Sequence, residues 1–106
     1  MAAYLLIESR DSFESNDVRY YFELARGLAD AGNQVSVFLV QNAVLAARES
    51  VRASAMRTLL DSRVKVFVDD FSMRERGIKR NLEGVEVAPI DLVIDRLEAG
   101  DKVLWH

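Results

Sequence analysis

Short, nearly continuous apolar runs alternate along the chain with longer stretches of mixed polarity. The runs lie at residues 3–9, 34–40 and 64–68, with shorter ones at 85–87 and 102–105. An unbroken apolar run of this length is typical of a strand that is buried on both faces of a sheet. The pattern therefore predicts about five strands.

The stretch after the first run has the spacing of a helix. Its apolar residues recur every three or four positions and form one stripe, which consists of Val18, Tyr21, Phe22, Ala25, Leu28 and Ala29. We expect Ser15, Asn16 or Asp17 to cap this helix and Gly32 to end it.

Three more helical stretches follow. One covers residues 42–62, in one or two pieces, and a short one covers 72–76 and stops at Gly77. The last begins at Pro89, a residue favoured in the first helical turn, and ends before Gly100. Its apolar face is formed by Ile90, Val93, Ile94 and Leu97.

Strands that alternate with helices over short loops favour an α/β fold, here a three-layer α/β/α sandwich with a mostly parallel sheet. The chain has 106 residues and no visible linker or repeat, so we expect a single domain over residues 1–106. In such sheets, ligands bind beyond the carboxyl ends of the strands. The segments of interest are therefore 8–17, 41–44, 69–77, 87–90 and the residue after Trp105.

The composition excludes several kinds of chemistry. The chain has no cysteine and one histidine, which rules out thiol nucleophiles, persulfides and cysteine-ligated metals, and we expect no cofactor. Its net charge of −3 makes nucleic-acid binding an unfavoured function. No apolar run is long enough for a membrane span, and no signal peptide is visible, so the expected location is the cytoplasm.

Polar residues at the expected strand ends are the candidate binding groups. They are Ser9, Asp11 and Ser12 after the first strand, and Asp69, Asp70, Ser72 and Arg76 after the third. Two adjacent carboxylates suit a hard cation such as magnesium, and one of them could act as a general base or a phosphoryl acceptor. The favoured interpretation of this pair is a helix cap with a solvated charge. The chain has no glycine-rich phosphate loop, and it lacks the other residues that a phosphoacceptor site of the response-regulator type needs. No residue is assigned a catalytic role.

Arg74, Arg76, Lys79 and Arg80 form a basic cluster. It is expected to neutralise Asp69 and Asp70, to pair with the acids Glu75 and Glu83, or to meet an acidic partner, and solvated charge is the commoner explanation of such a cluster.

Three aromatic residues, Tyr20, Tyr21 and Trp105, bear on assembly. Tyr20 and Tyr21 are adjacent and cannot both face one sheet from a helix, so at least one is expected to be exposed or in a subunit contact. Trp105 is expected to be a core or interface anchor. His106 has no evident partner in the sequence.

Three segments, taken together, resemble the DsrE/DsrF/DsrH (TusD/TusC/TusB) sulfur-relay family. They are LARGLADAGNQVSVFLVQNAV (24–44), VKVFVDDFSMRERGI (64–78) and LVIDRLEAGDKVLWH (92–106). The resemblance implies a small α/β domain that forms a homotrimer, a hexamer or a heteromeric complex with related subunits. It also implies a cysteine that carries sulfur as a persulfide at the end of the third strand, ahead of an Arg-Gly pair.

The chain departs from the family pattern at that site. Counting back from Arg76-Gly77, the cysteine positions fall at about Asp69 and Ser72, and neither residue can form a persulfide. The first hypothesis is therefore a non-catalytic DsrE-like subunit that oligomerises or binds a partner near sulfur transfer. The alternative is a domain that binds a small molecule or anion, with weak hydrolase activity as one form of it, in a pocket at the strand ends.

Overall fold

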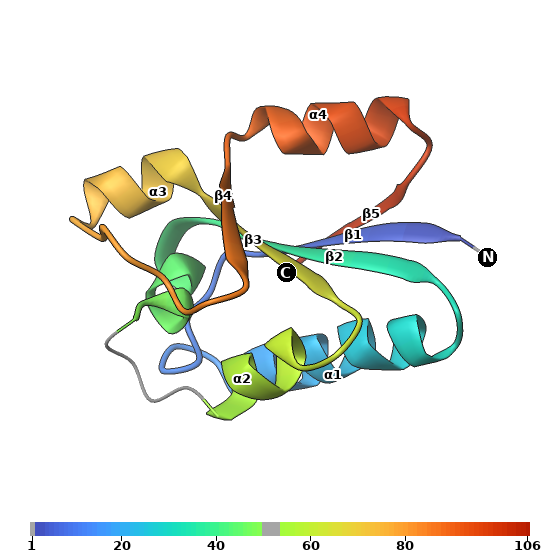
Figure 1. Cartoon of the computed structure of the whole chain (residues 1–106), viewed down its shortest axis with the longest axis horizontal. Coiled ribbons are helices and arrows are strands. Elements are labelled where there is room, and N and C mark those ends of the chain that lie inside the picture. The colour runs from blue at the N-terminus through green and yellow to red at the C-terminus, as the bar shows by residue number, and fades with distance from the viewer. Residues whose placement is uncertain (1, 50–53) are drawn as a thin grey trace.

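The computed structural model describes residues 2–49 and 54–106, and their strands form one parallel sheet in the order β4–β3–β2–β1–β5 (Figure 1). The strands are β1 (Ala3–Glu8), β2 (Gln34–Leu39), β3 (Lys65–Asp69), β4 (Val85–Ala88) and β5 (Lys102–Trp105). The helices are α1 (Asp17–Asp30), α2 (Ser54–Leu60), α3 (Asp70–Glu75) and α4 (Asp91–Glu98), with a 3₁₀ helix, η1 (Gln41–Ala47). The predicted α/β fold with five strands is confirmed.

Helices cover both faces of the sheet, which confirms the three-layer arrangement. In Figure 1, α1 and α2 lie on one face and α4 on the other, while η1 and α3 follow the carboxyl ends of β2 and β3. Among the described residues no helix is long and apolar enough to cross a membrane. The stretch predicted as helix over 42–62 is divided into η1 and α2, and its residues 50–53 lie outside the described part.

Side chains alternate between the two faces as the strand period requires. Leu6, Val37 and Val66 stand side by side in neighbouring strands and pack against α1 and α2. The next row, Ile7, Phe38 and Phe67, belongs to the core under α4. The stripe predicted on α1 packs into the first of these cores in full, with Tyr21 and Leu28 partly buried. Tyr20, the neighbour of Tyr21 in the sequence, is 60% exposed.

The ends of α1 agree with the expected signals in part. Asn16 is the N-cap residue but its side chain makes no capping hydrogen bond, whereas the hydroxyl of Ser15 accepts one from the backbone N–H of Asp17. Gly32 follows the helix with φ of +94°, a left-handed conformation that costs glycine little. The helix therefore ends where the sequence predicts.

The apolar face predicted for α4 does not pack on the sheet as a unit. Three of its four residues are exposed: Ile90 (50%), Ile94 (56%) and Leu97 (56%). The sheet is covered instead by Leu92, Val93 and Arg96, of which Val93 alone belongs to the predicted face. Leu92 and Val93 pack on the core, and Arg96 stacks over the ring of Phe67 at 5.8 Å and donates to Ser36 Oγ at 3.1 Å. We call Ile90, Ile94 and Leu97 the α4 strip.

Candidate functional site

A hollow of about 370 Å³ lies at the carboxyl ends of the strands, where the fold places ligands. It is lined by Val40 and Gln41 after β2, by Asp69, Asp70, Phe71, Ser72 and Glu75 after β3, by Pro89 and Ile90 after β4, and by Trp105 of β5. Three of the residues singled out from the sequence, Asp69, Asp70 and Ser72, thus meet in one place. Three of the five strand-end segments identified above, 41–44, 69–77 and 87–90, contribute to it.

A chain of hydrogen bonds holds the floor of this hollow. Asp69 is the N-cap of α3, and its Oδ2 accepts the backbone N–H of Ser72 at 3.1 Å and the Ser72 hydroxyl at 2.6 Å. The Ser72 hydroxyl in turn accepts the backbone N–H of Gln41 at 2.8 Å. Gln41 has φ of +51°, a left-handed conformation that is uncommon outside glycine. The bond to Ser72 therefore fixes a strained residue and ties the end of β2 to the end of β3.

Asp69 is a helix cap, as favoured from the sequence, but it is not a solvated one. The residue is only 6% exposed, and its Oδ1 is buried without a hydrogen-bond partner. Asp70, by contrast, is partly exposed and pairs with Arg74 across one helical turn at 3.5 Å. The two adjacent carboxylates therefore have different environments, and Oδ1 of Asp69 is a buried oxygen that lacks a hydrogen-bond donor.

The residues singled out after β1 do not line the hollow. The Ser9 hydroxyl donates to the backbone carbonyl of His106 at 2.9 Å, and Ser12 is exposed. Asp11 is 8% exposed, and its backbone carbonyl accepts the N–H of Glu14 while its own N–H donates to the Glu14 carboxylate. These contacts make the segment a structured turn.

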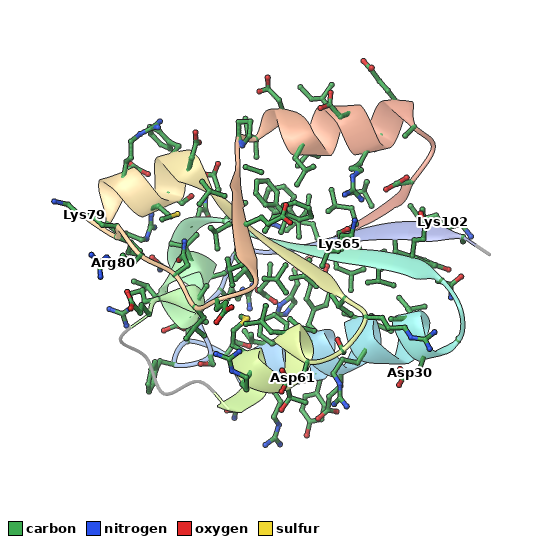
Figure 2. The ribbon with its side chains drawn as sticks, in the orientation of Figure 1. Asp30, Asp61, Lys65, Lys79, Arg80 and Lys102 are labelled. Carbon is green, nitrogen blue, oxygen red and sulfur yellow. The ribbon has the colours of Figure 1, made fainter. Side chains whose placement is uncertain are left out.

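The basic cluster borders a second, more open hollow of about 650 Å³, lined by Arg48, Glu49, Arg76, Gly77, Ile78, Lys79 and Arg80. Figure 2 shows Lys79 and Arg80 extending outward from the loop that follows α3. Arg76 is held in place by Asn42 Oδ1 at 2.9 Å and by the carbonyl of Ser72 at 3.2 Å. Arg80 lies 4.0 Å from Glu49, a partner that the sequence does not suggest. The cluster is mostly solvated charge.

His106 does have a partner, contrary to the expectation from the sequence. Its Nδ1 lies 2.7 Å from Oε2 of Glu8, which is completely buried at the end of β1. The other oxygen, Oε1, accepts the backbone N–H of Arg10 at 2.9 Å. The parallel pairing of β5 with β1 brings these residues together from 98 positions apart. Glu8 was detectable in principle, because a carboxylate at the end of a buried apolar run needs a partner.

Tyr21 packs against this pair, with its ring centroid 5.2 Å from that of His106. Burial, together with the nearby charge of Glu8, raises the pKa of the Tyr21 hydroxyl well above its usual value near 10. The phenol therefore stays protonated in the native protein at pH values where it ionises in the unfolded chain.

This shift predicts an alkaline loss of stability. Because the native pKa is the higher one, the stabilising effect is complete below pH 10 and is lost as the pH rises above it. Between pH 10 and 11 the loss should approach about 1 kcal/mol. Urea unfolding at both pH values measures it, and Tyr21→Phe should show a smaller loss than wild type. Tyr20→Phe, at the exposed neighbour, should behave like wild type, and equal slopes for all three proteins would contradict the assignment.

No metal centre emerges from the polar groups. Within residues 2–49 and 54–106 no three acidic or histidine side chains converge closely enough to hold a metal ion. The site is thus a partly apolar hollow with a buried carboxylate, and the Glu8–His106 pair forms a separate cluster at the ends of β1 and β5.

Comparison with models of protein families identifies the family of this chain. The model of the DsrE/DsrF-like family matches residues 2–106. The chain belongs to this family. No curated protein matches the chain.

Solved structures share the fold of this DsrE/DsrF-like protein. The ychN protein from E. coli has a TM-score of 0.87 at 20% identity, and MTH1491 from Methanobacterium thermoautotrophicum, described as of unknown function, has 0.86 at 18%. Both matches cover all of this chain and all of the other. BT1422 from Bacteroides thetaiotaomicron, also described as of unknown function, has a TM-score of 0.75 at 13% identity, over 98% of this chain and 94% of its own.

Proposed function

We propose that this DsrE/DsrF-like protein is a non-catalytic subunit that assembles with copies of itself, or with related subunits, in cytoplasmic sulfur relay. The observation that carries the proposal is the α4 strip. A helix of a globular protein ordinarily turns its apolar row toward the core. Here Ile90, Ile94 and Leu97 are each at least half exposed, and a surface of this kind is typical of a subunit contact.

The site supports the non-catalytic part of the proposal. The resemblance to sulfur-relay proteins puts the sulfur-carrying cysteine at about Asp69 or Ser72. In this chain the side chains of Asp69 and Ser72 are hydrogen-bonded to each other, and the Ser72 hydroxyl also accepts a hydrogen bond from the backbone N–H of Gln41. Persulfide chemistry needs a thiolate, and the chain has no cysteine. A structural use of these positions fits a subunit that binds rather than transfers.

Assembly is tested by the mass of the protein in solution. We expect size-exclusion chromatography with light scattering to give about three or six times the chain mass of 12.0 kDa. The double variant Ile94→Asp with Leu97→Asp should shift the mass toward that of a single chain, because it puts two charges into an apolar contact.

The matched control is Phe13→Asp, which changes an exposed aromatic residue in the loop between β1 and α1. It should leave the mass unchanged if the contact is made through α4. A single-chain mass for wild type at micromolar concentration, alone and mixed with other subunits of the family, would sink the proposal.

A further inference from the structure

We propose that the hollow beyond β2, β3 and β4 binds a small organic ammonium ion. Its N–H groups donate to the carboxylate of Asp69, and its apolar part packs among Phe71, Ile90 and Trp105. This binding site goes beyond the proposed role in assembly. It shares Ile90 with the α4 strip, so a subunit contact over that strip borders the hollow.

The first argument is the state of Asp69. The residue is 94% buried, since 6% of it is exposed, and it lines the hollow. One carboxylate oxygen accepts two hydrogen bonds from Ser72, and the other, Oδ1, accepts none. A buried carboxylate oxygen without a donor is unfavourable, and native proteins seldom leave one. An N–H donor in the hollow removes this penalty once a small rotation of the Asp69 side chain turns Oδ1 toward it.

The second argument is the sign of the charge. Two more carboxylates, those of Asp70 and Glu75, line the hollow, and among the described residues no Lys, Arg or His does. The basic partners of these two acids, Arg74 and Arg76, lie outside its lining. These arginines offset part of the charge of Asp70 and Glu75, whereas Asp69 has no salt bridge among the described residues, so the hollow favours a cation over an anion. The charge of Asp69 disfavours an anion, which is one of the ligands that the alternative hypothesis from the sequence allows.

The third argument is the apolar wall. The rings of Phe71 and Trp105 are 57% and 61% exposed, and Val40, Pro89 and Ile90 complete the lining. Exposed aromatic faces beside a carboxylate are suited to an organic cation, which gains from cation–π attraction as well as from burial of its carbon atoms. The volume of about 370 Å³ lies in the range of small-molecule sites. A hydrated metal ion would use neither ring.

Three probes that share a phenyl ring and carry a positive, neutral or negative polar group test the proposal: benzylammonium, benzyl alcohol and benzoate. Trp105 is the only tryptophan, so its fluorescence reports on the hollow directly. We expect benzylammonium to give a saturable change with a dissociation constant about tenfold or more below that of benzyl alcohol, and benzoate to give none.

Two variants of equal charge change separate Asp69 from the general acidity of the surface. Asp69→Asn retains an N-cap side chain but loses the carboxylate, and it should weaken benzylammonium binding about tenfold or more. Asp91→Asn, at an exposed acid of α4 outside the hollow, should change it by less than about twofold. Equal binding of the ammonium and the alcohol, or tighter binding of benzoate, would overturn the proposal.

The comparison of probes needs only the wild-type protein, so it remains decisive if Asp69→Asn fails to fold. Failure here is also distinct from failure of assembly, because the Ile94→Asp and Leu97→Asp variant leaves the lining of the hollow intact. That variant should bind benzylammonium as wild type does.

Discussion

Replacing Phe38 with alanine should lower the free energy of unfolding by about 3–5 kcal/mol, the largest stability effect expected in this chain. Phe38 is completely buried in the middle of the sheet and is the largest of the fully buried side chains. It lies in the small core that also receives Leu92 and Val93, through which α4 packs on the sheet. The cavity left by the ring would therefore weaken the attachment of α4 as well. Urea unfolding followed by circular dichroism measures the loss.

Phe71→Ala provides the matched control, because it removes the same side chain from a residue that is 57% exposed. Its stability should remain within about 0.5 kcal/mol of wild type. A comparable loss in both variants would mean that the sheet core under α4 is not the element that stabilises this face.

Replacing Ser72 with alanine is expected to cost about 2–3 kcal/mol, a large effect for the loss of one hydroxyl. The hydroxyl is the middle of a chain: it donates to Asp69 and accepts from the backbone of Gln41. Its removal leaves the Gln41 N–H without an acceptor and Asp69 Oδ2 with one donor fewer. The same urea titration measures the loss.

Ser12→Ala is the corresponding control, since Ser12 is an exposed serine at another strand end. Its effect should stay within about 0.5 kcal/mol. If Ser72→Ala were equally mild, the bond that holds the left-handed Gln41 would contribute little to the fold.

The strands and the main helix were predictable because their burial follows from sequence periodicity. The apolar runs at 3–9, 34–40 and 64–68 became the three central strands, and the stripe on α1 packs as its spacing predicts. Parallel strands need crossovers, so the alternation of runs and helices also constrained the topology. The gathering of Asp69, Asp70 and Ser72 follows from their short separation along the chain.

The helix α4 shows where periodicity is insufficient. Two sides of this helix carry apolar side chains, and the sequence gives greater apolar weight to Ile90, Ile94 and Leu97. The sheet is covered by the other side, because Arg96 can lay its guanidinium over Phe67 and bond Ser36 and Asp101. A charged side chain with a long apolar stem can thus cover a sheet as an apolar residue does.

Trp105 and His106 show a second limit. Trp105 stands beside Ile7 in the register of β5 with β1, yet it is 61% exposed at the edge of the sheet. It is therefore not a core residue, and the alternative of an interface residue stays a prediction. His106 finds Glu8 only through strand order, which local sequence does not specify. Which strand lies at an edge, and which partners it brings together, depends on pairing over nearly the whole chain.

The pairing of the last strand with the first has a consequence for the order of folding. The carboxylate of Glu8 and the ring that bonds it are 98 positions apart in the chain. Until β5 docks, β1 is an open edge that ends in a carboxylate without this partner. Contacts of such high sequence separation form late, because the entropy of closing a long loop must be overcome first. The docking of residues 102–106 is therefore the step that completes the sheet. It covers the open edge of β1, which lies next to the central strand β2.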